Sequence, residues 1–146
     1  MKEVQSGIFF SADRKDMDVD TIFRFIKQSY WGKSRTFEEQ QKALANTLNF
    51  GLFNNGKQIA FARVLTDHVF FAYLMDVFVL EPYRGNGYSK LLINEIMAHE
   101  PIKYIDKWML ATIDAHSLYS KFGFGTIKNP SRIMEKLSDR AKEIHQ

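Results

Sequence analysis

Cysteine is absent from the 146 residues of this chain, and proline occurs only three times. The absence of cysteine excludes a disulfide framework, a cysteine-ligated zinc or iron–sulfur site, and a covalent acyl-cysteine intermediate. The prolines (Pro82, Pro101 and Pro130) fall between periodic segments, where they mark loops. No repeat or low-complexity tract interrupts the chain. The length and composition therefore predict a single domain over residues 1–146, with an amphipathic tail over 131–146.

Long apolar runs and clusters of charge are also missing. The longest apolar run extends from Val69 to Met75, whereas a membrane-spanning helix needs about 18 apolar residues. The N-terminus lacks the apolar region of a signal peptide, so we expect a cytoplasmic protein without a membrane partner. The 20 Lys and Arg residues, against 17 Asp and Glu, are scattered along the chain, and we expect no nucleic-acid partner. No two of the four histidines have the spacing of metal ligands, and we predict no metal site.

What the chain does contain is ample apolar material, with 45% hydrophobic residues and 13 Phe, enough for the core of an α/β domain. Helical spacing and capping residues predict four helices, over residues 19–30, 36–49, 87–99 and 115–122. Asp18 is the candidate cap of the first helix, and Thr36 with Glu39 fits a capping box at the start of the second. Asp114 is the expected N-cap of the last of these, since Asp is among the best capping residues. A further amphipathic pattern covers 133–144.

The strands follow from β-branched and aromatic runs. An Asn-Gly pair at 55–56 predicts a β-hairpin between 52–53 and 58–61. The stretch 69–80 predicts a central strand buried on both faces. Shorter strands are expected before the first helix, over 108–111 and over 124–128, and the strand at 108–111 should run parallel to the central strand because strand–helix–strand units favour that crossover.

A glycine-bearing loop joins the central strand to the helix that starts near Gly87. Free N–H groups at a helix start attract anions, and glycine lets a phosphate approach the backbone closely. Gly85 and Gly87, with Arg84 and Lys90 nearby, therefore indicate a pyrophosphate-binding turn. The alternative is an ordinary strand-to-helix connection. A dinucleotide-binding motif is disfavoured because Lys90 stands at its third glycine position.

The same residues resemble a family motif. Residues 84–89, Arg-Gly-Asn-Gly-Tyr-Ser, are similar to the R/Q-x-x-G-x-G/A acyl-CoA-binding motif of the GNAT superfamily of N-acetyltransferases, with Ser89 at the last small position. Residues 118–124, Leu-Tyr-Ser-Lys-Phe-Gly-Phe, resemble the L-Y-x-K-x-G-F segment of that family. The resemblance implies a GNAT-like α/β fold, with a mixed, mostly antiparallel sheet, a central V-shaped splay between two parallel strands, and helices on both faces.

The resemblance also implies acetyl-CoA as the acyl donor, lying in the splay. The expected cofactor-binding residues are the backbone of Val77 and Val79, the loop and helix start, and two positions after the next strand: Arg84, Gly85, Asn86, Gly87, Tyr88, Ser89, Lys90, Thr112 and Ala115. Thr112 stands where the family often has Asn.

Two residues are candidates for catalysis. Tyr119 resembles the tyrosine that protonates the departing thiolate, and a phenol with a pKa of about 10 keeps its proton at neutral pH; the alternative is a core aromatic. Asp76 is the acid within the central strand, and burial would raise its pKa toward the range of a general base. Strand alternation places it opposite Tyr73 unless a bulge intervenes. The alternative is that Asp76 is a buried partner for Arg63. The amine proton would then leave through a water chain, with Tyr73 as a relay.

Substrate recognition is expected, by analogy with the family, from the loop between the first two helices and from residues near the splay: Tyr30, Trp31, Arg35, Tyr73 and His116. A hydrophobic latch formed by Tyr30 and Trp31 is the alternative. Arg35 and Lys33 would suit a substrate carboxylate or phosphate, whereas Asp76 would suit an amine. The predicted function is acetyl transfer to a primary amine, by direct attack in a ternary complex with a small-molecule acceptor. A non-catalytic acyl-CoA-binding module is the alternative. The amphipathic tail could pack on its own sheet or on a second subunit, so a homodimer is one possible assembly.

Overall fold

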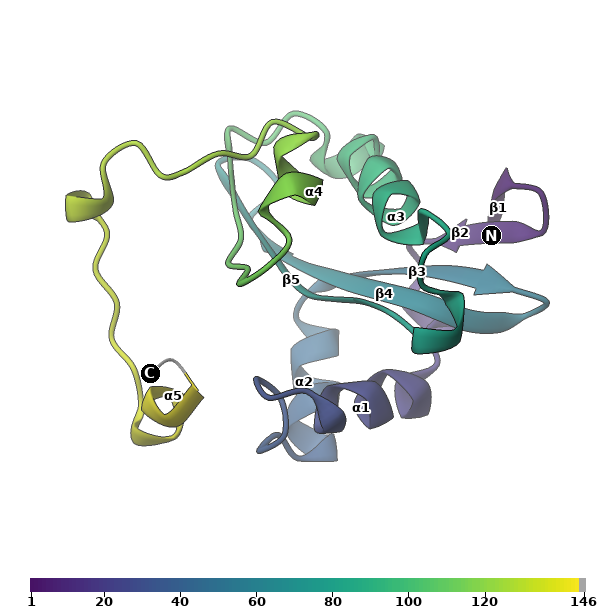
Figure 1. The fold of residues 1–146 in the computed structure, drawn as a ribbon, viewed down its shortest axis with the longest axis horizontal. Coiled ribbons are helices and arrows are strands. Elements are labelled where there is room, and N and C mark those ends of the chain that lie inside the picture. Colours follow the sequence, from purple (N-terminus) through teal and green to yellow (C-terminus); the bar gives the residue numbers. More distant parts are fainter. Residues whose placement is uncertain (145–146) are drawn as a thin grey trace.

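Within residues 1–144, which the computed structural model describes, six strands form one sheet (Figure 1). Their order in the sheet is their order in the sequence. The strands are β1 (Lys2–Gln5), β2 (Ile8–Ser11), β3 (Leu48–Asn54), β4 (Lys57–Thr66), β5 (Phe71–Val79) and β6 (Lys107–Met109). Neighbours are antiparallel except β5 and β6, which are parallel. The predicted fold class, a mixed and mostly antiparallel α/β sheet, is confirmed.

Helices cover both faces of this sheet. Figure 1 shows α1 (Val19–Gln28) and α2 (Phe37–Ala45) on one face, and α3 (Tyr88–Met97) with the short α4 (His116–Ser120) on the other. Two core clusters follow this division. Ile22, Ile26 and Leu44 pack with Phe61 and Phe78 under the first pair of helices. The second cluster joins α3 to the opposite sheet face through Leu92, Ile93 and Ile96.

The helix starts and the hairpin obey the local sequence signals. Asp18 caps α1 by accepting a hydrogen bond from the Thr21 N–H, at 3.1 Å. Thr36 and Glu39 form the expected capping box at the start of α2. Asn55 and Gly56 have φ values of 52° and 76°, the left-handed values that a two-residue hairpin turn requires. Both of the first helices end earlier than predicted, at Gln28 and Ala45.

The central strand β5 begins later than the sequence predicted. The Asp67 carboxylate accepts hydrogen bonds from the backbone N–H groups of Val69, Phe70 and Phe71, which keeps residues 67–70 in a turn. The prediction of burial on both faces is wrong for the first half of the strand. Ala72 and Leu74 are buried on the α3 face, while Phe71 is 37% exposed and Tyr73 and Met75 are only half-buried.

A β-bulge interrupts β5 at Asp76, whose φ is 55°. The pairing with β4 shifts there, because Phe61 pairs with Phe78 but Arg63 pairs with Met75. The extra residue turns the Asp76 side chain toward α1 and α2, the face that Tyr73 and Met75 also occupy. Strand alternation alone would have placed Asp76 on the other face.

The sheet splays between β5 and β6. The two strands pair from Phe71–Lys107 to Tyr73–Met109, after which β5 continues to Val79 paired with β4 and without β6 on its other side. The predicted V-shaped splay between parallel strands is therefore present.

The C-terminal predictions need correction. Residues 124–128 form no strand, since the chain turns after α4 and then runs extended away from the sheet (Figure 1). Within residues 131–144, the tail is α-helical only in α5 (Asp139–Ile144), and Ile133 and Met134 are 45% and 93% exposed. An exposed ion pair between Arg140 and Glu39 connects α5 to α2. Residues 145 and 146 of the predicted tail lie outside the described residues.

Two smaller observations complete the fold. The sequence predicted one strand before α1, whereas β1 and β2 form a hairpin there. Short 3-10 turns cover residues 14–16, 81–83, 100–102 and 130–132. Among the described residues, no helix has both the length and the apolar character needed to span a membrane.

Candidate functional site

The unpaired half of β5 presents backbone groups to the splay. The Leu80 N–H donates to the Ile59 carbonyl on β4, at 2.9 Å. Because successive residues of a strand point their backbone groups to opposite sides, Val79 and Val77 point theirs away from β4 and toward β6. β6 does not extend that far. Among the described residues, β6 therefore leaves the edge groups of Val77 and the N–H of Val79 unpaired, whereas the Val79 carbonyl accepts a hydrogen bond from Arg84.

The glycine loop lies at the end of this edge. Gly85 and Gly87 have φ values of 81° and 79°, and Gly87 is the N-cap of α3. No side chain caps this helix, so its first N–H groups are left for another acceptor. A Cβ added at either glycine would meet no atom within 4 Å, so the space above both is open. The Asn86 amide holds the loop by donating to the Tyr83 carbonyl, at 3.0 Å.

Arg84 is also tied into the loop. Its Nε donates to the Val79 carbonyl, at 3.0 Å, and its guanidinium lies 6.0 Å from the Phe25 ring of α1. A cavity of about 370 Å³ adjoins this side chain between α1 and the loop; it is lined by Phe25, Gln28, Ser29, Leu80, Glu81, Pro82 and Arg84. At the start of α3, Tyr88 and Ser89 are half-buried and Lys90 is exposed.

Tyr119 of α4 lies on the α3 side of the sheet. Its side chain is buried and packs edge-on against Phe124, with 6.0 Å between ring centroids. No group within residues 1–144 forms a hydrogen bond with its hydroxyl. Burial, and secondarily the charge of Asp114, raise the pKa of Tyr119 above its ordinary value. The hydroxyl therefore remains a proton donor at neutral pH.

The start of α4 differs from the prediction. Ala115, not Asp114, is the N-cap, and it makes no side-chain capping bond. Thr112 Oγ1 instead accepts a hydrogen bond from the Ala115 N–H, at 3.1 Å, and Asp114 is exposed. Ala115 packs at the edge of the core, and His116 is exposed. The structure thus places Thr112 and Ala115 together at the helix start, and leaves His116 outside the core.

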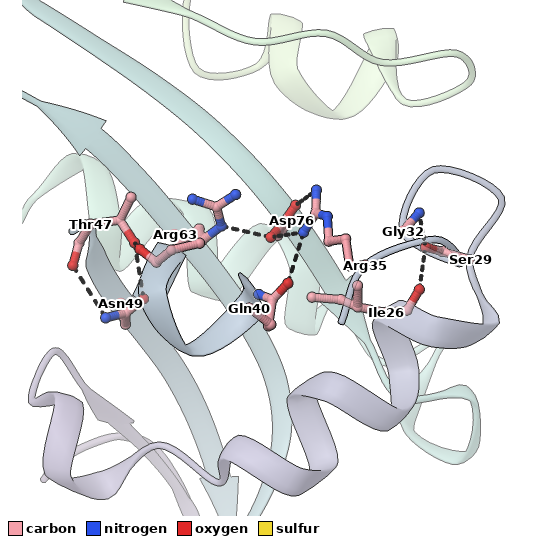
Figure 2. Close-up of polar contacts among 10 residues, drawn as sticks. Ile26, Ser29, Gly32, Arg35, Gln40, Thr47, Asn49, Arg63 and Asp76 are labelled. Carbon is pink, nitrogen blue, oxygen red and sulfur yellow. Dashed lines mark hydrogen bonds and ion pairs between the residues drawn. The ribbon is translucent and has the colours of Figure 1, made fainter. Parts of the chain in front are cut away.

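On the opposite face, Asp76 joins two arginines (Figure 2). Arg35, from the loop between α1 and α2, donates from Nη1 and Nη2 to the two carboxylate oxygens, at 2.7 and 3.2 Å. Arg63 of β4 donates from Nε, at 2.6 Å. The Asp76 side chain is only 3% exposed. The buried-partner alternative for Asp76 and Arg63 is therefore observed, with Arg35 as an unexpected third member.

The expected rise in the pKa of Asp76 is wrong. Burial is the largest single influence and does raise the pKa, but the hydrogen bond from Arg35 and the charges of Arg63 and Arg35 together outweigh it. The net effect lowers the pKa of Asp76 below its ordinary value. A carboxylate in this state does not accept a proton readily at neutral pH, which removes the physical reason for choosing it as the general base.

The other predicted acceptor-binding residues are dispersed. Trp31 packs against the α1 cluster, and the Arg35 guanidinium lies 5.2 Å above its ring, so Trp31 acts as the latch of the alternative interpretation. Tyr30 next to it is 57% exposed. Tyr73 lies beyond the bulge with Met75 and Leu65, which is 48% exposed. We call Leu65, Tyr73 and Met75 the open sheet face.

Comparisons with known proteins agree with this geometry. A family model described as "Acetyltransferase (GNAT) domain" matches residues 46–126, more than half of the chain. The chain belongs to the GNAT acetyltransferase family. This match covers the splay, the glycine loop and Tyr119.

Among solved structures, the GNAT protein described as "a putative acetyltransferase belonging to the gnat family" from Xanthomonas campestris pv. campestris is 41% identical, with a TM-score of 0.87 over 90% of this chain and 93% of that chain. "Putative acetyltransferase FG08082" from Gibberella zeae is 26% identical over 73% of this chain; the match spans 60% of that relative's length. A "predicted acetyltransferase with acetyl-CoA" from Clostridium acetobutylicum shares the fold, with 16% identity, a TM-score of 0.65, and 90% of this chain and 96% of that chain covered.

Two contacts in the cluster around Asp76 were not predicted from the sequence. Gln40 of α2 is fully buried and accepts a hydrogen bond from Arg35, at 3.0 Å (Figure 2). Its position on the apolar side of an amphipathic helix was an available signal, since a polar residue there needs a partner. The pairing of Arg35 with Asp76 joins residues far apart in the sequence, and no local pattern could have indicated it.

Proposed function

We propose that this GNAT protein transfers an acetyl group from acetyl-CoA to a primary amine of a small molecule, by direct attack in a ternary complex. The observation that carries the proposal is the glycine loop, with open space above Gly85 and Gly87, at the end of the unpaired edge of β5. Direct attack fits a chain without cysteine, the residue best suited to hold an acyl group covalently.

The residues around this loop fit an acyl-CoA. Free N–H groups at the start of α3, together with Arg84 and Lys90, suit a pyrophosphate, and a Cβ at either glycine would occupy the space that a phosphate needs. The edge groups of Val77 and the N–H of Val79 suit the amide groups of a pantetheine arm, since the Val79 carbonyl is held by Arg84. Thr112 and Ala115 border the other side, at the start of α4.

When bound, acetyl-CoA supplies a thioester, whose C–S bond breaks as the amine nitrogen bonds to the carbonyl carbon. Tyr119 is proposed to give its phenolic proton to the departing sulfur. Its hydroxyl has no partner within residues 1–144, and its raised pKa keeps the proton in place until a stronger base forms. Tyr119 then regains a proton from water.

The amine must lose a proton, and no carboxylate within β4 or β5 except Asp76 is available. With the pKa of Asp76 lowered, we propose that water takes this proton, with the half-buried Tyr73 as a relay. The acceptor is proposed to be small because the chain is short and forms a single sheet with one splay. His116 and Tyr30 are proposed to lie at the rim of the acceptor region, since both are exposed.

We also propose a homodimer, in which residues 125–138 of one copy pack on another copy. This segment has exposed Ile127, Ile133 and Met134 and leaves the body of the domain. The edge strand β6 pairs only with β5, so it can accept a further strand.

Calorimetric titration with acetyl-CoA tests the proposed function. Gly87→Ala should weaken binding about 10-fold or more, because the new Cβ enters the phosphate space. Gly7→Ala is a matched control: Gly7 has a φ of 76°, also with no atom within 4 Å, but lies in the β1–β2 turn. Both variants should lose about 1–2 kcal/mol of stability through the same backbone strain.

If Gly87→Ala and Gly7→Ala weaken acetyl-CoA binding equally, or if the unaltered protein does not bind acetyl-CoA, the cofactor assignment is contradicted. Binding should be accompanied by acetyl-CoA-dependent release of free thiol when amines are supplied. Binding without turnover of any amine would favour the non-catalytic module instead.

A further inference from the structure

The cluster around Asp76 carries an unbalanced positive charge. Two guanidinium groups, of Arg35 and Arg63, face one carboxylate. The two strands that bear the cluster, β4 and β5, contain no acidic residue other than Asp76. Gln40, the other polar group in contact, is neutral. The cluster therefore has a net charge of about +1 in a region where burial of an unpaired charge is unfavourable in free energy.

The terminal nitrogens of Arg35 are engaged by the protein. Both of its terminal nitrogens donate to Asp76, Nη1 also donates to Gln40, and the group lies against the Trp31 ring. Neither terminal nitrogen is left without a protein partner, so Arg35 offers no free pair of terminal nitrogens to a bidentate anion. The sequence-based assignment of a substrate anion to Arg35 thus loses its physical basis.

Arg63 differs from Arg35 in this respect. Only its Nε is paired, and its side chain is 10% exposed. Within residues 1–144, neither terminal nitrogen has a hydrogen-bond partner, and neither is sealed from solvent. Figure 2 shows Arg63 joined to Asp76 through Nε alone. A nearly buried guanidinium that keeps two adjacent donors free is well arranged to bind a carboxylate or phosphate in a bidentate manner.

The position of Arg63 connects these donors with the open sheet face. Arg63 pairs with Met75 across the strands, and Leu65, next but one along β4, pairs with Tyr73. Tyr73 is also the last residue of β5 that pairs with β6. An anion held by Arg63 would lie on the open sheet face, close to the point at which the splay begins.

We infer that the acceptor amine carries a carboxylate or phosphate group, which binds to the terminal nitrogens of Arg63. This inference rests on the proposed function, and it makes Arg63 a specificity-determining residue. Asp76 acts as a positioning residue, because its bond to Nε fixes the plane of the guanidinium and directs the free nitrogens outward.

The test compares amines that carry an anionic group with counterparts that lack it. The protein is saturated with coenzyme A, which occupies the loop at α3, and is titrated with glycine, glycinamide, O-phosphoethanolamine and ethanolamine. The NMR signal of the Arg63 Nε–H is followed, with the Arg35 signal as an internal control. We expect glycine or O-phosphoethanolamine to shift the Arg63 signal and to bind about 10- to 100-fold more tightly than its neutral counterpart. The two charged probes distinguish a carboxylate from a phosphate.

Arg63→Gln should abolish this difference while leaving the affinity for acetyl-CoA unchanged. Arg63→Lys keeps the charge and should retain part of the preference. Arg63→Gln leaves Arg35 and Asp76 as a balanced ion pair, and Arg63→Lys serves as the second variant if Arg63→Gln does not fold. Equal binding of charged and neutral amines, or an Arg63 signal unmoved by all four probes, would overturn the inference. If acetyl-CoA does not bind at all, the proposed function fails, and the same titration without coenzyme A still reports on Arg63.

Discussion

Replacing Asp76 by Asn tests whether the buried ion-pair cluster holds the loop between α1 and α2 to the sheet. The substitution keeps the shape of the side chain and removes its charge, which leaves Arg35 and Arg63 without a counter-ion. Breaking a buried ion pair at one partner costs about 3–5 kcal/mol. The Arg35 side chain is 25% exposed and can regain water, so we expect the lower end, about 3 kcal/mol.

For 146 residues, the entropy of unfolding is about 0.3 kcal/mol per kelvin, so this loss lowers Tm by about 10 °C. Differential scanning calorimetry at neutral pH measures this change in Tm. Arg140→Gln is the control: it breaks the exposed Arg140–Glu39 pair and should leave Tm nearly unchanged, because solvent screens that pair. If Asp76→Asn leaves Tm as little changed as Arg140→Gln does, the reasoning about the cluster is refuted.

The pH dependence of stability has a defined sign. The pKa of Asp76 is lower in the folded protein than in the unfolded chain. Its contribution to stability is therefore fully present above the ordinary carboxyl pKa of about 3.9, and is lost as the pH falls through the lower folded value. The difference in Tm between the unaltered protein and Asp76→Asn should shrink in that acid range and remain constant above it.

Two further predictions concern Tyr119 and the C-terminal segment. Tyr119→Phe should lower kcat by about 100-fold or more, with an unchanged Kd for acetyl-CoA, because it removes only the proton donor; an unaltered kcat in steady-state assays would exclude that role. Deleting residues 125–146 should convert a dimer to a monomer in light scattering after size exclusion, because the exposed apolar segment is then missing; a full chain that already elutes as a monomer would refute the dimer.

Much of the fold follows from local sequence signals. Asp18, the Thr36–Glu39 capping box and the Asn55-Gly56 turn each form the predicted structure, because they depend on contacts between residues close in the chain. The glycine loop and the placement of Tyr119 on a helix beyond the splay were predictable for the same reason, since short motifs specify them. The start of β5 could not be predicted in this way, because the Asp67 carboxylate accepts hydrogen bonds from three backbone N–H groups.

The sequence by itself determined the order of the elements, the splayed parallel pair and the loop that suits an anion, since each depends on periodicity, turn residues or motif spacing. Only the tertiary structure decided the role of Asp76. The bulge turns its side chain to the α1–α2 face, and two arginines from other elements lower its pKa against the effect of burial. The same contacts engage Arg35 and leave Arg63 with free donors, because partners distant in the sequence meet only when the chain is folded.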